Sequence, residues 1–311
     1  MNASKPVPDI KVVIVSSVRN RRDITLQCLR SLDRVDTTGL SIHKIIVDDG
    51  SSDGTSEAIR KAFPVVELIQ GSGDLWCSGG ANLGVTRALT YEPDYILLIN
   101  DDTVFDGKFL VNLVKTAEDN PKTVVGGLLL LWDQPHKVFQ VAPIWDTWYG
   151  GWRHLNEQTV WSVPGEPFEV EIIVGNCTLF PARTFLEEGL FATRWLPHYG
   201  DAEYTPRLRR RGWKLLIDPA ARVFNQPNDV PARMSKMTME QLYNALWKHY
   251  NGPHNLRNRF MCYWLGAPSR LKGLLGFLIY TVRLGLQWTG LGPRWEAMGN
   301  EKPLKEKYQK L

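Results

Sequence analysis

From residue 11 to residue 131 the sequence alternates between short apolar, β-branched runs and segments whose apolar residues recur at helical spacing. This order predicts a mostly parallel sheet, because a parallel strand pair needs a crossover connection and a helix usually supplies it. We expect strands at 11–18, 43–47, 65–69, 94–100 and 124–131, and helices at 22–32, 56–63, 82–89 and 109–118. The predicted fold class is α/β, with a doubly wound sheet that carries helices on both faces.

The later part of the chain changes character twice. Residues 132–175 are rich in Trp, Pro and Gly, which predicts loops and antiparallel strands. A strand follows at 221–224, and from about residue 236 the pattern is helical, with expected helices at 237–250, 256–265 and 271–288. We therefore divide the chain into an α/β domain, 1–235, and a helical C-terminal extension, 236–311.

The net charge of +4 hides an asymmetry between the two ends of the chain. Residues 207–311 contain 19 Lys and Arg against six Asp and Glu, whereas residues 1–206 contain 18 against 27. An acidic first part fits metal and nucleotide chemistry. A basic last part fits an anionic partner, such as a phosphorylated acceptor or a lipid surface, and no nucleic-acid partner is expected.

Cysteine spacing and apolar run lengths bear on the compartment. The four cysteines are far apart and form no CxxC pair, so neither a zinc site nor a disulfide framework is indicated. The N-terminus lacks the apolar core of a signal peptide, and no run approaches the roughly 20 apolar residues that span a bilayer. We expect a cytoplasmic protein, either free or peripheral at the inner face of the cytoplasmic membrane.

Residues 270–290 carry the feature behind the membrane alternative. Apolar residues recur there at helical spacing and basic residues flank them: Leu271, Leu274, Leu275, Leu278, Val282 and Leu286, with Arg270, Lys272 and Arg283. A basic amphipathic helix lying in a membrane interface has this pattern. Packing of the same stripe on the catalytic domain explains it equally well.

An acidic pair follows four consecutive apolar residues, 96–99, of an expected strand, in Asn100-Asp101-Asp102. Parallel sheets place ligands at the carboxyl ends of their strands. Two adjacent carboxylates that lose hydration there need a positive partner, and a divalent cation carrying a phosphorylated ligand supplies one. The alternative interpretation of the pair alone is a loop or an Asx-turn.

Three further segments end strands or begin helices with residues of similar chemistry. The first is an acidic, Gly-rich turn from Asp48 to Thr55, in which Asp53 alternatively caps the next helix. The second, Gly79-Gly80-Ala81-Asn82, permits close backbone approach and offers a helix N-terminus to an anion, or is a simple loop and cap. The third runs from His198 through Asp201 to Gly212, where Asp201 is either a catalytic carboxylate or a residue at a helix start.

Together and in this order, these four segments resemble the family 2 glycosyltransferases of the GT-A fold, over about residues 11–260. The resemblance is greatest to bacterial members that build rhamnose-containing surface polysaccharides. It implies nucleotide binding by Asp48 or Asp49, with Ser51 in the same turn. It also assigns donor contacts to four other positions: Gly79, Gly80, Asn82 and Arg207.

The same resemblance implies the chemical roles. Asp102 would bind Mg²⁺ or Mn²⁺ and Asp101 the ribose or the metal shell, while Asp201 would be the catalytic base. Two positions depart from the family pattern. Gly200 replaces the usual Glu before the base, and Asn225 stands where many members have a third metal ligand, His, so metal independence stays open.

The resemblance implies an inverting glycosyltransferase. It would move a sugar from a dTDP- or UDP-sugar, with dTDP-L-rhamnose as the specific expectation, to a hydroxyl of a glycan or lipid-linked glycan. One alternative is a non-catalytic glycan-binding or assembly protein with a GT-A fold. Another is a nucleotidyltransferase, against which stands the absence of glycine after the first strand, at residues 16–20.

Overall fold

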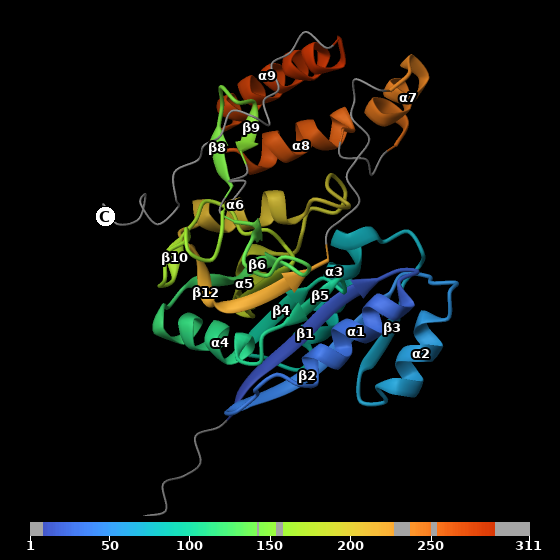
Figure 1. Ribbon diagram of the computed structural model, residues 1–311, viewed down its shortest axis with the longest axis vertical. Helices are drawn as coiled ribbons and strands as arrows, with labels where there is room; N and C mark the ends of the chain where they lie inside the picture. Colours follow the sequence, from blue (N-terminus) through green and yellow to red (C-terminus); the bar gives the residue numbers. More distant parts are fainter. Residues whose placement is uncertain (1–8, 142, 154–157, 227–236, 250–253, 290–311) are drawn as a thin grey trace, which may run out of the picture.

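A computed structural model describes residues 9–141, 143–153, 158–226, 237–249 and 254–289 (Figure 1). Its strands are β1 (Ile10–Val18), β2 (Leu40–Asp48), β3 (Glu67–Gln70), β4 (Tyr95–Ile99), β5 (Thr103–Phe105), β6 (Thr123–Leu131), β7 (Val138–Gln140), β8 (Ile144–Asp146), β9 (Gly151–Arg153), β10 (Phe168–Glu169), β11 (Cys177–Pro181) and β12 (Lys214–Asn225). Its α-helices are α1 (Arg22–Leu32), α2 (Thr55–Ala62), α3 (Trp76–Leu89), α4 (Phe109–Asp119), α5 (Arg183–Glu188), α6 (Asp201–Arg210), α7 (Met239–Tyr243), α8 (Leu256–Gly266) and α9 (Arg270–Thr289).

The central sheet has the strand order β10-β12-β6-β11-β4-β1-β2-β3, with β5 beside β12 and β7 beside β6. Strands β3, β2, β1 and β4 are parallel neighbours, and β6 is parallel to β12. The short strand β11 joins these two parallel groups by antiparallel pairing with both β4 and β6. The prediction of a mostly parallel α/β sheet is confirmed.

Helices cover both faces of this sheet because successive side chains of a strand point to opposite sides. In β1, Val13 packs on the face that contains Val85 of α3, whereas Ile14 packs on the face that contains Leu29 of α1. Helices α1, α2 and α4 contribute to the second apolar cluster, and α3, α5 and α6 to the first. The doubly wound arrangement is therefore confirmed.

The C-terminal helices form a stack at one end of the molecule, with α8 between α6 and α9 (Figure 1). A third apolar cluster joins them, and Tyr263 of α8 and Tyr280 of α9 lie at its centre. Arg210 of α6 also donates a hydrogen bond to the carbonyl of Leu265 at 2.7 Å. The helical C-terminal region is confirmed, while the boundary at residue 235 lies outside the described residues and the division into domains stays a prediction.

Two predicted helices have different bounds in the structure. Helix α3 begins at Trp76 and not at Asn82, so the second half of the Gly-rich segment is helical. The helix expected at 237–250 is a short α-helix, α7, followed by a π-helix at Asn244–Lys248, and residue 250 lies outside the described residues. Among the helices that the structure describes, none is both long enough and apolar enough to cross a membrane.

Candidate active site

Three strand ends bring the acidic turns together. Strands β1, β2 and β4 are parallel and adjacent, with Val18 opposite Asp48 and Val15 opposite Leu98. The loops that follow these strands therefore leave the same edge of the sheet, as expected for an open α/β sheet that binds its ligand there. The turn after Asp48, the turn before α1 and the Asn100-Asp101-Asp102 turn share this edge.

A guanidinium group bridges the acidic pair. Arg21, just before α1, contacts Oδ1 of Asp101 at 3.0 Å and Oδ2 of Asp102 at 3.1 Å. The hydroxyl of Thr25 donates to the other oxygen of Asp101 at 2.8 Å. The sequence predicted a positive partner for these carboxylates, and Arg21 is one that sequence analysis missed. Its signal was a basic residue in the loop that follows a neighbouring parallel strand.

Burial and neighbouring charges oppose each other at Asp101. Burial raises the pKa of this carboxyl, and the adjacent Asp102 raises it further, while Arg21 and the Thr25 hydroxyl lower it; the net direction is upward. The pKa of Arg21 is lowered by burial but raised more by the two carboxylates, so the guanidinium stays charged. The three groups thus form a compact charged cluster with a net negative charge.

Two buried groups beside this cluster lack hydrogen-bond partners. Asp102 Oδ1 has none among the described residues, and neither has the amide oxygen or nitrogen of Asn225. The two residues lie on neighbouring backbone segments, because the Gln226 N–H donates to the Asp102 carbonyl at 3.0 Å and Asn225 pairs with Thr103. Unpartnered buried oxygens are costly, and hard cations prefer such ligands.

The oxygen ligands at this place can hold a divalent cation only if the side-chain amide of Asn225 is one of them. The described residues contain no group of three or more His, Cys, Asp and Glu side chains that could hold a metal ion. Asp102 Oδ1 and Asn225 Oδ1 are the free oxygens, whereas the oxygens of Asp101 already accept from Arg21 and Thr25. The arrangement favours Asp102 and Asn225 as ligands and Asp101 as the residue that fixes Arg21.

The carboxylate of Asp49 holds the start of α3. Its Oδ1 accepts from the Gly73 N–H at 2.7 Å, and its Oδ2 accepts from the Leu75 and Trp76 N–H groups at 2.9 and 3.1 Å. An acidic side chain that takes the free N–H groups of a first helical turn stabilises the helix. This is why α3 starts earlier than the sequence predicted.

The side chains of Asp48 and Ser51 form hydrogen bonds with residues in and next to this turn. Asp48 accepts from the Ser51 N–H at 2.9 Å and from the Ser56 hydroxyl, and the Ser51 hydroxyl accepts from the Asn20 N–H at 2.8 Å. These bonds tie the loop after β1 to the loop after β2. In this structure Asp48 and Ser51 shape the edge of the site, and nucleotide contact by Asp48, Asp49 or Ser51 stays a prediction.

The Gly-rich segment serves packing in this structure. A Cβ atom on Gly80 would lie 2.0 Å from Ser17 Oγ, so glycine lets α3 approach β1. The Asn82 side chain forms two hydrogen bonds of 3.0 Å with the backbone of Phe191. Neither these residues nor Gly79 lines the cavity described below, which takes Cys77, Ser78 and Ala81 from α3 instead.

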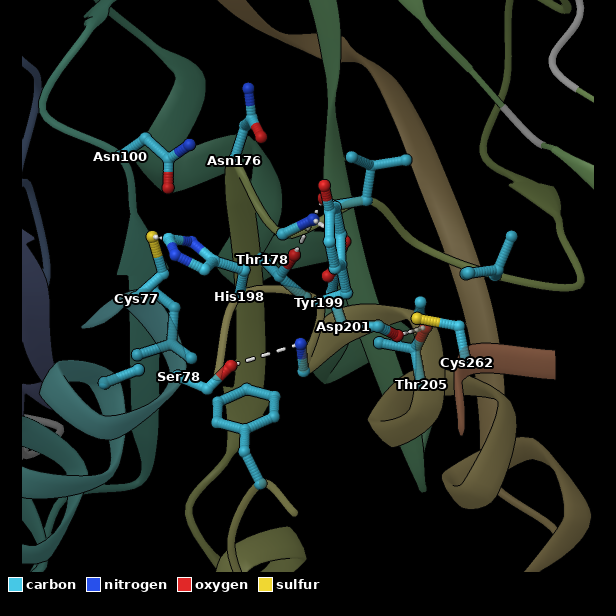
Figure 2. Close-up of a pocket in the computed structure, with 18 of the residues that line it drawn as sticks. Cys77, Ser78, Asn100, Asn176, Thr178, His198, Tyr199, Asp201, Thr205 and Cys262 are labelled. Atoms are coloured by element: carbon cyan, nitrogen blue, oxygen red, sulfur yellow. Dashed lines mark hydrogen bonds between the residues drawn. The ribbon is translucent and has the colours of Figure 1, made fainter. Parts of the chain in front are cut away.

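A cavity of about 450 Å³ opens between the sheet edge and the C-terminal helices. Figure 2 shows Asn100 and Cys77 on one side of it and Asp201, Thr205 and Cys262 on the other. Its other lining residues come from β11, from α8 and from the antiparallel hairpin of β8 and β9, and include Thr178, Arg259, Tyr263 and Trp152. The first residue of the acidic motif and the proposed base thus face one enclosed space.

Asp201 stands at the start of α6, and its Oδ2 accepts from the Gly175 N–H at 3.1 Å. Burial raises the pKa of this carboxyl, and the backbone N–H groups of Gly175, Ala202 and Asp201 only partly oppose the effect. A carboxylate whose proton affinity is raised by burial inside a cavity is suited to accept a proton from a hydroxyl.

The structure explains why glycine precedes Asp201. A Cβ atom on Gly200 would lie 2.7 Å from Ser78 Oγ and 3.0 Å from the Phe191 ring. The Gly200 N–H also donates to the Ser78 hydroxyl at 3.2 Å. The departure from the family pattern therefore follows from the close contact of α6 with α3, and it leaves Asp201 in the cavity.

Cys77 lies within the electrostatic reach of both Asp201 and the acidic pair. Burial raises the pKa of its thiol, and the charges of Asp201 and Asp101 add to the effect. Its Sγ is 3.6 Å from Nδ1 of His198, whose ring packs on Trp76 with centroids 4.8 Å apart. Burial lowers the pKa of His198, which keeps the ring neutral. The two carboxylate sites are therefore parts of one region.

Arg207 is engaged away from the cavity. Its guanidinium pairs with Glu203 at 2.8 Å and donates to the carbonyls of Glu188 and Leu190. It also covers the Tyr204 ring. The geometry supports a structural role, in which Arg207 fixes the segment between α5 and α6, and a donor contact by Arg207 stays a prediction.

Comparisons with known proteins agree with this geometry. The model of the family described as glycosyl transferase family 2 matches residues 13–161. The match covers slightly less than half of the chain, and it shows that these residues are similar to that family. They contain the Asp48–Asp49 turn and the acidic pair, whereas Asp201 and Asn225 lie beyond the match.

A solved structure shares the fold of this chain. The crystal structure of GalNAc-T7 with UDP, GalNAc and Mn²⁺ is similar, with a TM-score of 0.59 and 14% identity over 86% of this chain. The likeness covers 53% of the GalNAc-T7 chain, and at this identity it shows the GT-A-like fold alone. No curated protein matches the sequence.

Proposed function

We propose that the chain acts as an inverting glycosyltransferase. It would move a sugar from a nucleotide diphosphate donor, of the dTDP or UDP class, to a hydroxyl of a glycan or lipid-linked glycan. The observation that carries the proposal is the cavity that is lined both by Asn100, the first residue of the acidic-pair turn, and by Asp201, a half-buried carboxylate whose pKa is raised. The presence of UDP and Mn²⁺ in the GalNAc-T7 structure supports the donor class.

The donor would lie along the edge formed by the turns after β1, β2 and β4. Asp49 directly follows β2, and its carboxylate accepts hydrogen bonds from the N–H groups of Gly73 and Leu75. We expect the nucleobase of the donor to bind beside the loop that these bonds hold. Asp102 and Asn225 would hold Mg²⁺ or Mn²⁺ through their unpartnered oxygens. When bound, the cation offsets the charge of the departing diphosphate.

The acceptor hydroxyl would enter the cavity beside Asp201. The carboxylate takes the hydroxyl proton while the hydroxyl oxygen forms the new bond to the anomeric carbon, and the diphosphate leaves on the opposite side. The Gly175 N–H holds one oxygen of Asp201 and so orients the other. The aromatic and neutral side chains that line the cavity, among them Tyr263 and His198, would contact the sugar rings and exclude water.

The specific expectation of dTDP-L-rhamnose as donor rests on the sequence resemblance. A direct assay that compares dTDP-L-rhamnose with UDP-hexoses identifies the donor sugar. The non-catalytic alternative shares the fold but does not require a carboxylate of raised pKa to face the cavity. The structure therefore favours catalysis.

The proposal is tested by the release of nucleoside diphosphate. The purified protein is incubated with dTDP- and UDP-sugars and a total lipid extract as acceptor source, with Mn²⁺ or with EDTA. We expect release from one donor class. This release should be lost in Asp102→Asn, because the substitution removes the carboxylate charge that would hold the cation beside the diphosphate. Equal release by wild type and Asp102→Asn would contradict the donor site.

A further inference from the structure

Helix α9 has two apolar faces, and only one of them is buried. Its inner face, with Gly273, Gly276, Tyr280 and Leu284, packs on α8 and on the hairpin β8–β9. The outer face carries six exposed apolar side chains: Leu271, Leu274, Leu275, Leu278, Val282 and Leu286. At 3.6 residues per turn these six fall within one face about 120° wide, opposite to the buried one.

Packing on the catalytic domain therefore does not account for this stripe. Leu271 and Val282 are 66% and 65% exposed, and Leu278 is 51% exposed. A contiguous apolar face of this kind on a protein surface marks an interaction site. Figure 1 shows α9 as the outermost helix of the C-terminal stack, on the side away from the sheet.

The charges around the stripe identify the partner. Arg270 lies on one side of the outer face, and Lys272 and Arg283 lie on the other side. Between residues 237 and 289, the described residues include six Lys and Arg but a single acidic residue, Glu240. Arg283 lies over the Tyr149 ring and donates to the Tyr149 carbonyl, and Arg270 lies over the Trp264 ring, whereas Lys272 is exposed. The charges of all three attract an anionic lipid surface, and Lys272 can reach its headgroups while its alkyl stem stays on the apolar surface.

We propose that α9 lies in the interface of an anionic membrane and anchors the protein there. A second copy of the chain is a poorer occupant, because a two-fold contact through α9 would place the basic flanks of both copies against each other. The exposed Trp148 of the hairpin and Trp247 near α7 suit the headgroup region, where aromatic side chains concentrate.

The position of this surface has a consequence for the acceptor. Helix α8 packs against α9 through Tyr263, and the same helix lines the cavity with Arg259, Cys262 and Tyr263. One helix layer thus separates the membrane-facing surface from the site. This step rests on the proposed function: the acceptor class would be a lipid-linked glycan that remains in the bilayer during transfer.

Vesicle flotation of the full chain, without donor, tests the surface. The vesicles contain phosphatidylcholine alone or phosphatidylcholine with phosphatidylglycerol. The variant pair Leu278→Glu and Val282→Glu places carboxylates on the outer face. The matched control, Val65→Glu with Leu186→Glu, changes residues that are 81% and 71% exposed elsewhere. We expect binding to the anionic vesicles to fall at least about tenfold in the first pair only, and to weaken with salt.

A second variant distinguishes a loss of membrane binding from a loss of folding. Lys272→Glu reverses one basic flank on an exposed position and should reduce binding to the anionic vesicles several-fold without lowering the melting temperature. The proposal is overturned if wild type does not float with anionic vesicles, if the outer-face variants float equally well, or if sedimentation equilibrium shows that they dissociate a dimer instead. Donor release is measured separately, so failure of either proposal is recognised by itself.

Discussion

Replacing Asp201 by Asn removes the proposed base while keeping the shape of the side chain. The Gly175 N–H, 3.1 Å from Oδ2, can donate to an amide oxygen as well as to a carboxylate. The cavity and the start of α6 should therefore be preserved. An amide does not accept the proton of an attacking hydroxyl, so the variant isolates the chemical step from donor binding.

The size of the effect follows from the role. A positioned general base contributes about 10²- to 10⁴-fold to a rate, which corresponds to about 2.7–5.4 kcal/mol of activation free energy. We expect turnover of Asp201→Asn to fall by a factor in this range. Donor binding should stay unchanged, because the acidic-pair region does not contact Asp201 through any hydrogen bond among the described residues.

The raised pKa of Asp201 fixes the direction of two pH effects. Activity should rise with pH through a pKa above the usual value of an aspartate, because only the ionised form accepts a proton. The folded state binds this proton more tightly than the unfolded state. Its stabilising contribution is therefore full below the unfolded pKa and is lost as the pH rises through the folded pKa. At neutral pH, Asp201→Asn should be at least as stable as wild type.

The assay combines nucleoside diphosphate release over a pH series with melting temperatures of the same proteins. Asp119→Asn, an exposed position at the end of α4, is the matched control and should retain activity and melting temperature. An Asp201→Asn protein that turns over donor at a rate close to wild type would refute the assignment of the base. A variant that melts below the assay temperature would instead contradict the expectation that Asp201→Asn is at least as stable as wild type.

Three further predictions concern the donor side and the fold. Arg21→Ala leaves two buried carboxylates without their guanidinium, so unfolding free energy should fall by about 1–3 kcal/mol; Mn²⁺ should raise its melting temperature more than that of wild type, and equal shifts would count against a cation site there. Asn225→His offers a stronger ligand and should lower the Mn²⁺ concentration for half-maximal release several-fold; an unchanged requirement would argue against Asn225 as a ligand. Gly80→Ala places a Cβ atom 2.0 Å from Ser17 Oγ and should lower the free energy of unfolding by about 1–3 kcal/mol in a denaturant titration. Gly107→Ala, with open space around it, should change the free energy of unfolding little, and equal effects of the two substitutions would refute the packing argument.

Local patterns explain which parts of the fold were predictable. The bounds of α1 were predicted as the structure has them, and those of β1 to within one residue, because β-branched runs and helical apolar spacing depend on adjacent residues. The place of β11 between β4 and β6 was not predictable, since a strand of five residues carries no signal for its distant partners. The early start of α3 depends on Asp49, more than 20 residues away in sequence.

The same distinction holds for the site. The acidic turns were visible because they follow apolar strands. Arg21 was missed because its pairing with Asp101 spans a sequence separation of 80 residues. For Arg207 the motif alone implied a donor contact, and only the structure shows its guanidinium on the carbonyls of Glu188 and Leu190. The glycine at position 200 is explained only by its contact with α3.

The most direct test of the account is the melting temperature of the purified protein with dTDP, UDP, GDP, CDP or CMP, each with Mn²⁺ or with EDTA. A ligand that binds the native state alone raises the melting temperature by mass action. We predict a shift with dTDP or UDP that needs Mn²⁺ and is lost in Asp102→Asn. The absence of a shift with every nucleotide would contradict the donor site and with it the proposed sugar transfer.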